Sequence, residues 1–159
     1  MAVALWLRMT AQASANTNSS VTRVPTICDE PKTVLVIPSG HNDEPVCNAV
    51  RDRVPASCVR MDAESAFSFL RSDPFSVTAV VLCGDGKSST SSSVLEGIKA
   101  VAPRVPVVFL DERESADSEM TIRRAGIHYY THLPANSGEI VAVLTHLVEA
   151  PGESAGRQS

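Results

Sequence analysis

The sequence predicts an α/β fold of three layers, in which helices cover both faces of a parallel sheet. Three observations support this prediction. Five short runs rich in Val, Ile and Leu recur along the chain, and they lack the polar alternation of strands that are exposed on one face. A segment with apolar residues at helical spacing follows each run. Proline, glycine or small polar residues mark most of the boundaries.

The predicted strands are apolar along most of their length, which is typical of strands buried on both faces. Pro38, Ser39 and Gly40 end the first strand. The third strand, which ends at Cys83, is the most apolar of the five. The strands are predicted at residues 33–37, 57–61, 77–83, 105–110 and 127–133.

The first two predicted helices have clear start or stop signals. Asn42 or Asp43 can cap the first helix, because a short polar side chain can accept a hydrogen bond from a free backbone amide there. Pro55 ends this helix, and the pair Asp73-Pro74 ends the second one.

The last three predicted helices are placed by similar local signals. The serine-rich run 87–93 is predicted as a loop, with the third helix beginning near Ser93. The fourth helix is predicted at residues 115–126. Asn136, with Glu139 three residues later, resembles a capping box at the start of the fifth helix.

These five βα units predict a flavodoxin-like sheet with strand order 2-1-3-4-5, because crossovers between parallel strands are right-handed. We predict one domain at residues 32–150, between a flexible arm (1–31) and a flexible tail (151–159). The first 28 residues lack acids, so a transit peptide is an alternative for the arm. A translation start at Met9 is another.

Composition argues against several classes of protein. The chain has 159 residues and a formal net charge of −4, without a long basic run, so nucleic-acid binding is not expected. No apolar run reaches the roughly 18 residues that span a bilayer. The four cysteines form no C-x-x-C pair, which favours reduced thiols in a cytoplasmic protein and gives no sign of a zinc site.

Two segments carry a resemblance to a known family. They are VPVVFLDE at residues 105–112 and RRAGIHYYTHLP at residues 123–134. Together with the βα rhythm over residues 32–150, they resemble the fourth strand, fifth strand and proline turn of the receiver domain of bacterial response regulators. The resemblance implies a signalling module with the flavodoxin-like fold.

The residues that a working receiver uses are replaced in this sequence. Such a domain holds Mg²⁺ with two acids after strand one and accepts a phosphoryl group on an Asp that ends strand three. A hydroxyl after strand four and a Lys before the proline bind the phosphoryl oxygens. The resemblance places the acid pair on Pro38 and Ser39, the acceptor on Cys83, the hydroxyl on Asp111 and the lysine on Leu133.

Two positions keep the family pattern: Tyr130 at the rotameric aromatic switch, and Pro134 at the cis-proline turn. The resemblance therefore implies a degenerate receiver (a pseudo-receiver). Such a module is not an enzyme, needs no cofactor and acts through protein–protein contacts. Its output face would combine the fourth helix, fifth strand and fifth helix, with Tyr129, Tyr130 and His132 on it. A homodimer is an open alternative.

Other interpretations assign the chain a metal site, a nucleophilic thiol or a different regulatory role. Asp43, Asp85 and Asp111 could hold a divalent metal ion in an atypical receiver or small enzyme. They could also be a cap acid, a turn acid and a loop acid, all solvated. Cys83 with His41 and Asp43 would be a thiol nucleophile only if a base lay within hydrogen-bond reach. A third class is a detached regulatory domain of an enhancer-binding transcription activator.

Overall fold

Strands and helices alternate through the chain, as the apolar spacing predicts. The computed structural model describes residues 32–39, 43–84, 88–113 and 115–150, so the arm and tail predicted at the two ends lie outside the described residues. The elements are β1 (Thr33–Ile37), α1 (Glu44–Arg53), β2 (Ser57–Arg60), α2 (Ala63–Ser72), β3 (Val77–Gly84), α3 (Ser88–Val101), β4 (Val107–Asp111), α4 (Ala116–Arg124), β5 (Tyr129–His132) and α5 (Ser137–Glu149).

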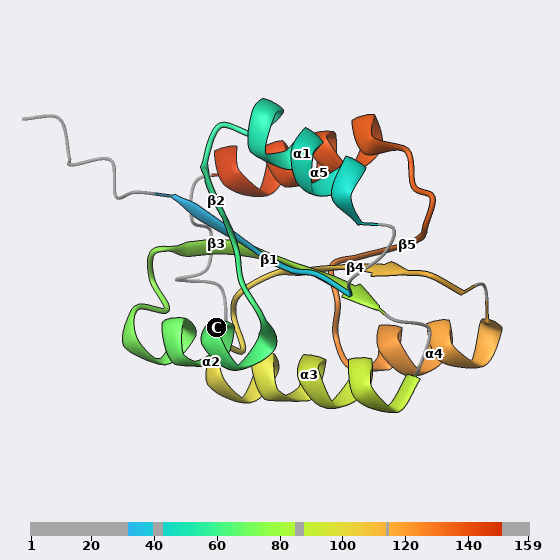
Figure 1. Ribbon diagram of the computed structural model, residues 1–159. Helices are drawn as coiled ribbons and strands as arrows, with labels where there is room; N and C mark the ends of the chain where they lie inside the picture. The colour runs from blue at the N-terminus through green and yellow to red at the C-terminus, as the bar shows by residue number, and fades with distance from the viewer. Residues whose placement is uncertain (1–31, 40–42, 85–87, 114, 151–159) are drawn as a thin grey trace, which may run out of the picture.

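The strands form one parallel sheet in the order β2-β1-β3-β4-β5, which confirms the predicted fold class. Helices α1 and α5 cover one face of the sheet, and α2, α3 and α4 cover the other (Figure 1). None of the helices within the described residues has the length and apolar character that a membrane crossing needs.

The three central strands are buried, as their apolar sequences require. Side chains alternate between the two faces, so Val34 and Val36 pack under α1 and α5 while Leu35 and Ile37 pack under the other layer. Each buried Val, Leu or Ile side chain contributes about 1.5–3 kcal/mol through removal of apolar surface from water. The two resulting cores hold the ends of the central strands in fixed positions.

The start of α3 differs from the prediction. The serine-rich run was predicted as a loop, but α3 already begins at Ser88. Ser91 lies one turn inside the helix and is buried. Serine is tolerated in the first turns of a helix, where its hydroxyl can bond to nearby backbone groups. The helix is stabilised by the apolar residues that follow, Leu95 and Ile98, which are fully buried.

The last strands are shorter than predicted. The prediction extends β4 back to Val105, but this residue lies in a turn in which its amide donates to the carbonyl of Ala102 (3.1 Å). The prediction also begins β5 at Ile127, whereas the strand begins at Tyr129. Helix α4 ends before Gly126, whose φ of +82° is a left-handed conformation that favours glycine.

The helix caps agree with the sequence only in part. Asn136 accepts a hydrogen bond from the amide of Gly138 (2.9 Å), as a capping residue should. The predicted capping box is wrong in its second half. Instead of returning to the Asn136 backbone, the Glu139 carboxylate accepts a hydrogen bond from the hydroxyl of Tyr129.

Candidate functional site

The carboxyl ends of the parallel strands meet at one edge of the sheet, and this edge contains most of the residues predicted from the resemblance. Pro38 and Ser39 follow β1, and Leu133 follows β5. Cys83 is the second-last residue of β3, and Asp111 is the last residue of β4. Gly84 is the register partner of Asp111. The topology therefore brings the predicted positions together, as the doubly wound fold requires.

Within this edge, the residues divide between the two faces of the sheet. Cys83 and Leu133 belong to the core beneath α1 and α5. Asp111 shares a face with Phe109, two residues earlier in β4, and contacts Tyr130 in the opposite core. A hydrogen bond from the Ser39 hydroxyl to the Glu112 carboxylate (2.9 Å) connects the β1 and β4 ends.

On the face of α1, Asp43 and Cys83 form the first cluster. Asp43 precedes α1 at the N-cap position and is 1% exposed. Its side chain does not cap the helix: one carboxylate oxygen accepts from the Ser39 amide (3.1 Å). The other oxygen lies 3.7 Å from the guanidinium of Arg60, which is half exposed at the end of β2. The predicted solvated cap acid is therefore a buried carboxylate.

Cys83 lies in this cluster as a buried thiol. Burial raises its pKa well above the ordinary value of 9.0, and the charges of Asp43 and Cys47 raise it further. A thiol in these surroundings stays protonated and is a poor nucleophile. His41, the third member of the hypothetical thiol triad, lies outside the described residues.

On the opposite face, Asp111 forms the second cluster. Its carboxylate is 2% exposed and accepts hydrogen bonds from the hydroxyls of Tyr130 (3.0 Å) and Ser118 (3.2 Å) and from the amide of Arg113 (3.3 Å). The prediction of a solvated loop acid is wrong here too, because Asp111 is the last residue of β4 and α4 packs beside it.

Tyr130 points into the core and not outward from the predicted output face. It is 7% exposed, and its ring stacks parallel to Phe109 at 5.8 Å and meets His132 edge to face at 5.1 Å. The Arg123 guanidinium lies 5.3 Å from the ring centre, within cation–π range. Burial raises the pKa of Tyr130, and the hydrogen bond to Asp111 raises it further.

Pro134, His132 and Asp85 are the remaining predicted residues of this edge. The peptide bond between Leu133 and Pro134 is cis. The ring nitrogen Nδ1 of His132 is buried and has no hydrogen-bond partner within the described residues. Asp85, the residual acid of the third strand, lies outside the described residues. The described part of the chain holds no group of three His, Cys, Asp or Glu side chains placed to bind a metal ion.

The sequence analysis singled out two partners of the buried acids, Ser39 and Tyr130, but missed two others, Arg60 and Ser118. Neither residue belongs to a motif: Arg60 ends β2, and Ser118 lies in the first turn of α4. The one available signal for Arg60 was its place at the end of β2, which puts it at the functional edge. For Ser118, the first turn of α4 was known, but its direction toward β4 was not.

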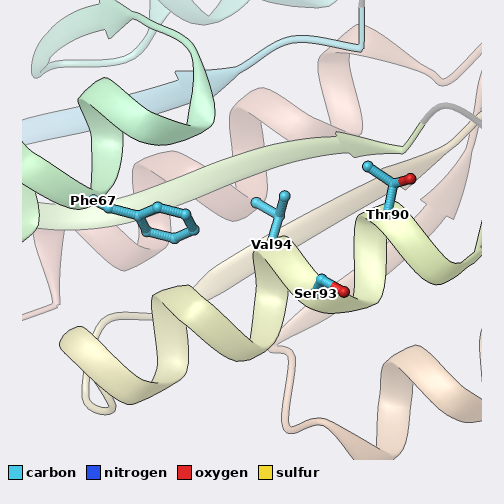
Figure 2. Close-up of a pocket in the computed structure, with 4 residues that line it drawn as sticks. All are labelled: Phe67, Thr90, Ser93 and Val94. Atoms are coloured by element: carbon cyan, nitrogen blue, oxygen red, sulfur yellow. The ribbon is translucent and has the colours of Figure 1, made fainter.

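A shallow groove lies between α2 and α3. It has a volume of about 430 Å³ and is lined by Phe67, Thr90, Ser93 and Val94. Figure 2 shows Phe67 extending from α2 toward α3, with Val94 beside it. The ring of Phe67 comes so near Gly97 that a Cβ built on this glycine would lie 2.7 Å from the ring.

Comparison with known proteins shows similarity to solved structures in fold. No family model matches the sequence, and neither does any curated protein. Among solved structures, a response regulator from Thermotoga maritima is 17% identical with a TM-score of 0.61, over 74% of this chain and 97% of that one. A CheY-like protein (tadZ) from Pseudomonas aeruginosa PAO1 is 14% identical with a TM-score of 0.60, over 73% of this chain and 98% of that one.

A pilus assembly-related protein from Burkholderia pseudomallei K96243 is similar as well. It is 12% identical with a TM-score of 0.61, over 77% of this chain and 93% of that one. At these identities, the likeness concerns the fold and not the site. The five-stranded order and the helix layers agree with it. The chain therefore has the fold of the CheY-like receiver domains of response regulators.

Proposed function

We propose that this chain is a pseudo-receiver, a signalling module that acts by protein–protein contact without conventional phosphorylation of an aspartate. The observation that supports this proposal best is the residue at the acceptor position. Cys83 is buried there, and its raised pKa keeps the thiol neutral. A thiol cannot form the acyl phosphate that a receiver aspartate forms, so the usual covalent signal has no acceptor at this position.

Neighbouring positions support the same proposal. Pro38 and Ser39 supply no carboxylate for a divalent ion, and Leu133 supplies no cation for phosphoryl oxygens. Asp111 adds a negative charge where the resemblance places a hydroxyl, and like charge repels a phosphoryl group. Asp43 and Asp111 both use their oxygens in internal contacts, which leaves them less free to bind a metal ion.

Incubation with acetyl phosphate and Mg²⁺, followed by intact-mass measurement, tests the absence of phosphorylation. We expect no phosphoryl adduct, while a receiver domain with the complete acid set is labelled under the same conditions. An adduct on the wild-type chain would overturn the proposal. Loss of such an adduct in Asp85→Ala would assign it to Asp85 and would favour the atypical-receiver alternative.

For the output, we propose the surface formed by α4, β5 and α5, where the β5 edge of the sheet meets both helix layers (Figure 1). Met120 on α4 supports this choice, because it is a large apolar side chain that is 50% exposed. Tyr129 also reaches this surface, where its hydroxyl binds Glu139. The surface therefore offers a partner one apolar side chain beside the polar pair of Tyr129 and Glu139.

Two matched substitutions test the output surface. Met120→Glu should abolish binding of the partner that an affinity screen identifies with the wild-type chain. Phe75→Glu should leave that binding unchanged, because Phe75 is 88% exposed on the turn before β3, outside the proposed surface. Equal affinity of Met120→Glu and wild type in a titration would place the contact elsewhere.

Pilus assembly is a second context for such a module. Two of the matching structures are from pilus assembly proteins of Burkholderia pseudomallei and Burkholderia thailandensis, and others are from response regulators. The same fold therefore occurs in proteins of both descriptions. The affinity screen distinguishes the two contexts for this chain, since the partner would be a signalling protein in one and a component of an assembly machine in the other.

A further inference from the structure

We infer that Asp111 is a positioning residue whose buried carboxylate fixes α4 and β5 against the end of β4, and so sets the shape of the proposed output surface without a covalent modification. The inference rests on the proposed function, because that surface is the one assigned there to partner binding. We call the group of Asp111, Ser118, Tyr130 and Arg123 the carboxylate latch. Its members come from β4, α4 and β5.

The contacts of Asp111 connect three separate segments. One carboxylate oxygen accepts from the hydroxyl of Tyr130 in β5 (3.0 Å) and from the hydroxyl of Ser118 in α4 (3.2 Å). The other accepts from the amide of Arg113 in the loop between β4 and α4 (3.3 Å). Hydrogen bonds to a charged acceptor are stronger than those between neutral groups, so each bond restrains its segment.

The charge of Asp111 makes these bonds necessary. The side chain is 2% exposed, and no Lys, Arg or His in the described part of the chain forms an ion pair with it. A buried carboxylate without a counter-ion requires hydrogen-bond donors to offset its desolvation. Rotation of Tyr130 away from the core, or a shift of the first turn of α4, would remove a donor. The anion therefore disfavours arrangements of α4 and β5 in which Ser118 or Tyr130 no longer donates to it.

Tyr130 extends the latch to the surface. The Arg123 guanidinium stacks over its ring at 5.3 Å from the ring centre, and the same guanidinium pairs with Glu119 (2.7 Å). The Arg123 side chain is about half exposed, one turn along α4 from Met120. Removal of the Asp111 charge should thus change both the order of α4 and the position of a cation on the proposed output surface.

Hydrogen–deuterium exchange on the isolated chain tests the latch. In Asp111→Asn and in Tyr130→Phe, amides of α4 and β5 should exchange about tenfold faster, the factor expected when a hydrogen bond to a charged group is lost. Amides of β1 should keep their wild-type rates. The matched controls are Asp117→Asn, an exposed acid on the same helix, and Tyr129→Phe, which removes the other tyrosine hydroxyl. Asp117→Asn should leave α4 and β5 unchanged. Tyr129→Phe, whose lost hydrogen bond joins β5 to α5, should leave α4 unchanged.

Wild-type exchange rates in α4 and β5 of both Asp111→Asn and Tyr130→Phe would overturn the inference. A uniform increase that includes β1 would also overturn it, because Asp111 would then contribute only to global stability. Should Asp111→Asn fail to fold, Tyr130→Phe alone decides. No partner or phosphoryl donor is used, so a phosphoryl adduct in the earlier experiment would remove the proposed function and leave the latch standing, and unchanged exchange would do the reverse.

Discussion

The carboxylates and thiols at the functional edge owe their properties to burial. Asp43 and Asp111 are each almost fully removed from water, and each is surrounded by donors from other segments. Cys83 lies among apolar side chains beside one of these anions. The oxygens of Asp43 and Asp111 are therefore already engaged in internal contacts, and their negative charge disfavours an incoming anion.

The thiol of Cys83 should react slowly in the native chain. Burial and the charge of Asp43 raise its pKa, so the reactive thiolate is scarce near pH 8. Timed alkylation with iodoacetamide, followed by peptide mass mapping, measures the rate at each cysteine. We expect Cys83 to react only after unfolding in urea. Rapid alkylation of Cys83 in the folded chain would show that the thiol is accessible and ionised.

Asp43 should contribute to stability through its buried contacts. Asp43→Ala leaves the Ser39 amide and the Arg60 guanidinium without their acceptor, and we expect a loss of about 2 kcal/mol in the free energy of unfolding. Asp52→Ala is the matched control, because Asp52 is exposed on the same helix, and it should change stability by less than about 0.5 kcal/mol. Urea unfolding measures both. Equal effects would mean that the Asp43 contacts have no net value.

At the scale of elements, helices on the two faces of the sheet contribute different side chains to the functional edge. Helix α1 follows the β1 loop and brings Asp43 to the functional edge, whereas α4 brings Ser118 and Arg123 to the opposite face. Helices α2 and α3 pack closely through Phe67 and Gly97 and leave the shallow groove between them. The α2–α3 contact therefore involves none of the residues of the two acid clusters.

Close packing of α2 on α3 should depend on the missing side chain at Gly97. Gly97→Ala raises helix propensity by about 1 kcal/mol, but the new Cβ would lie 2.7 Å from the Phe67 ring. We expect the substitution to stabilise the chain in a Phe67→Ala background and to lose most of that gain in wild type. A double-mutant cycle from urea unfolding measures the coupling. Equal gains in both backgrounds would show that the ring moves freely.

At the scale of the whole molecule, the fold buries several weak acids that stay neutral at physiological pH. The pKa values of Cys47, Cys58 and Cys83 are raised, with desolvation as the largest cause. The same holds for Tyr129 and Tyr130. Each of these groups stabilises the folded state only while it is protonated. Together they should make the free energy of unfolding fall as the pH becomes alkaline.

Stability should accordingly fall above about pH 9. A raised pKa means that the native state holds its proton where the unfolded chain has lost it, starting from an ordinary thiol value of 9.0. The contribution is complete below that pH and declines as the pH rises. Urea unfolding at pH 7, 9 and 10 tests this, with Cys83→Ala expected to flatten the decline. A constant free energy of unfolding over this range would contradict it.

The sequence by itself determined the fold class and nearly every element. Strand and helix periodicity is a local property, because a two-residue or 3.6-residue repeat can be read without knowledge of contacts. Boundaries were less certain where local signals were weak, as in the serine-rich start of α3. The positions at the functional edge also followed from the sequence, because strand ends of a parallel sheet meet at one edge.

Only the tertiary structure decided how those positions are used. Register and pleat put Cys83 and Asp111 on opposite faces of the sheet, although both end neighbouring strands. Packing of α1 and α4 over the edge buried Asp43 and Asp111, and distant residues such as Arg60 and Tyr130 became their partners. Burial, pKa and hydrogen bonding depend on neighbours in space, which a local pattern in the sequence does not contain.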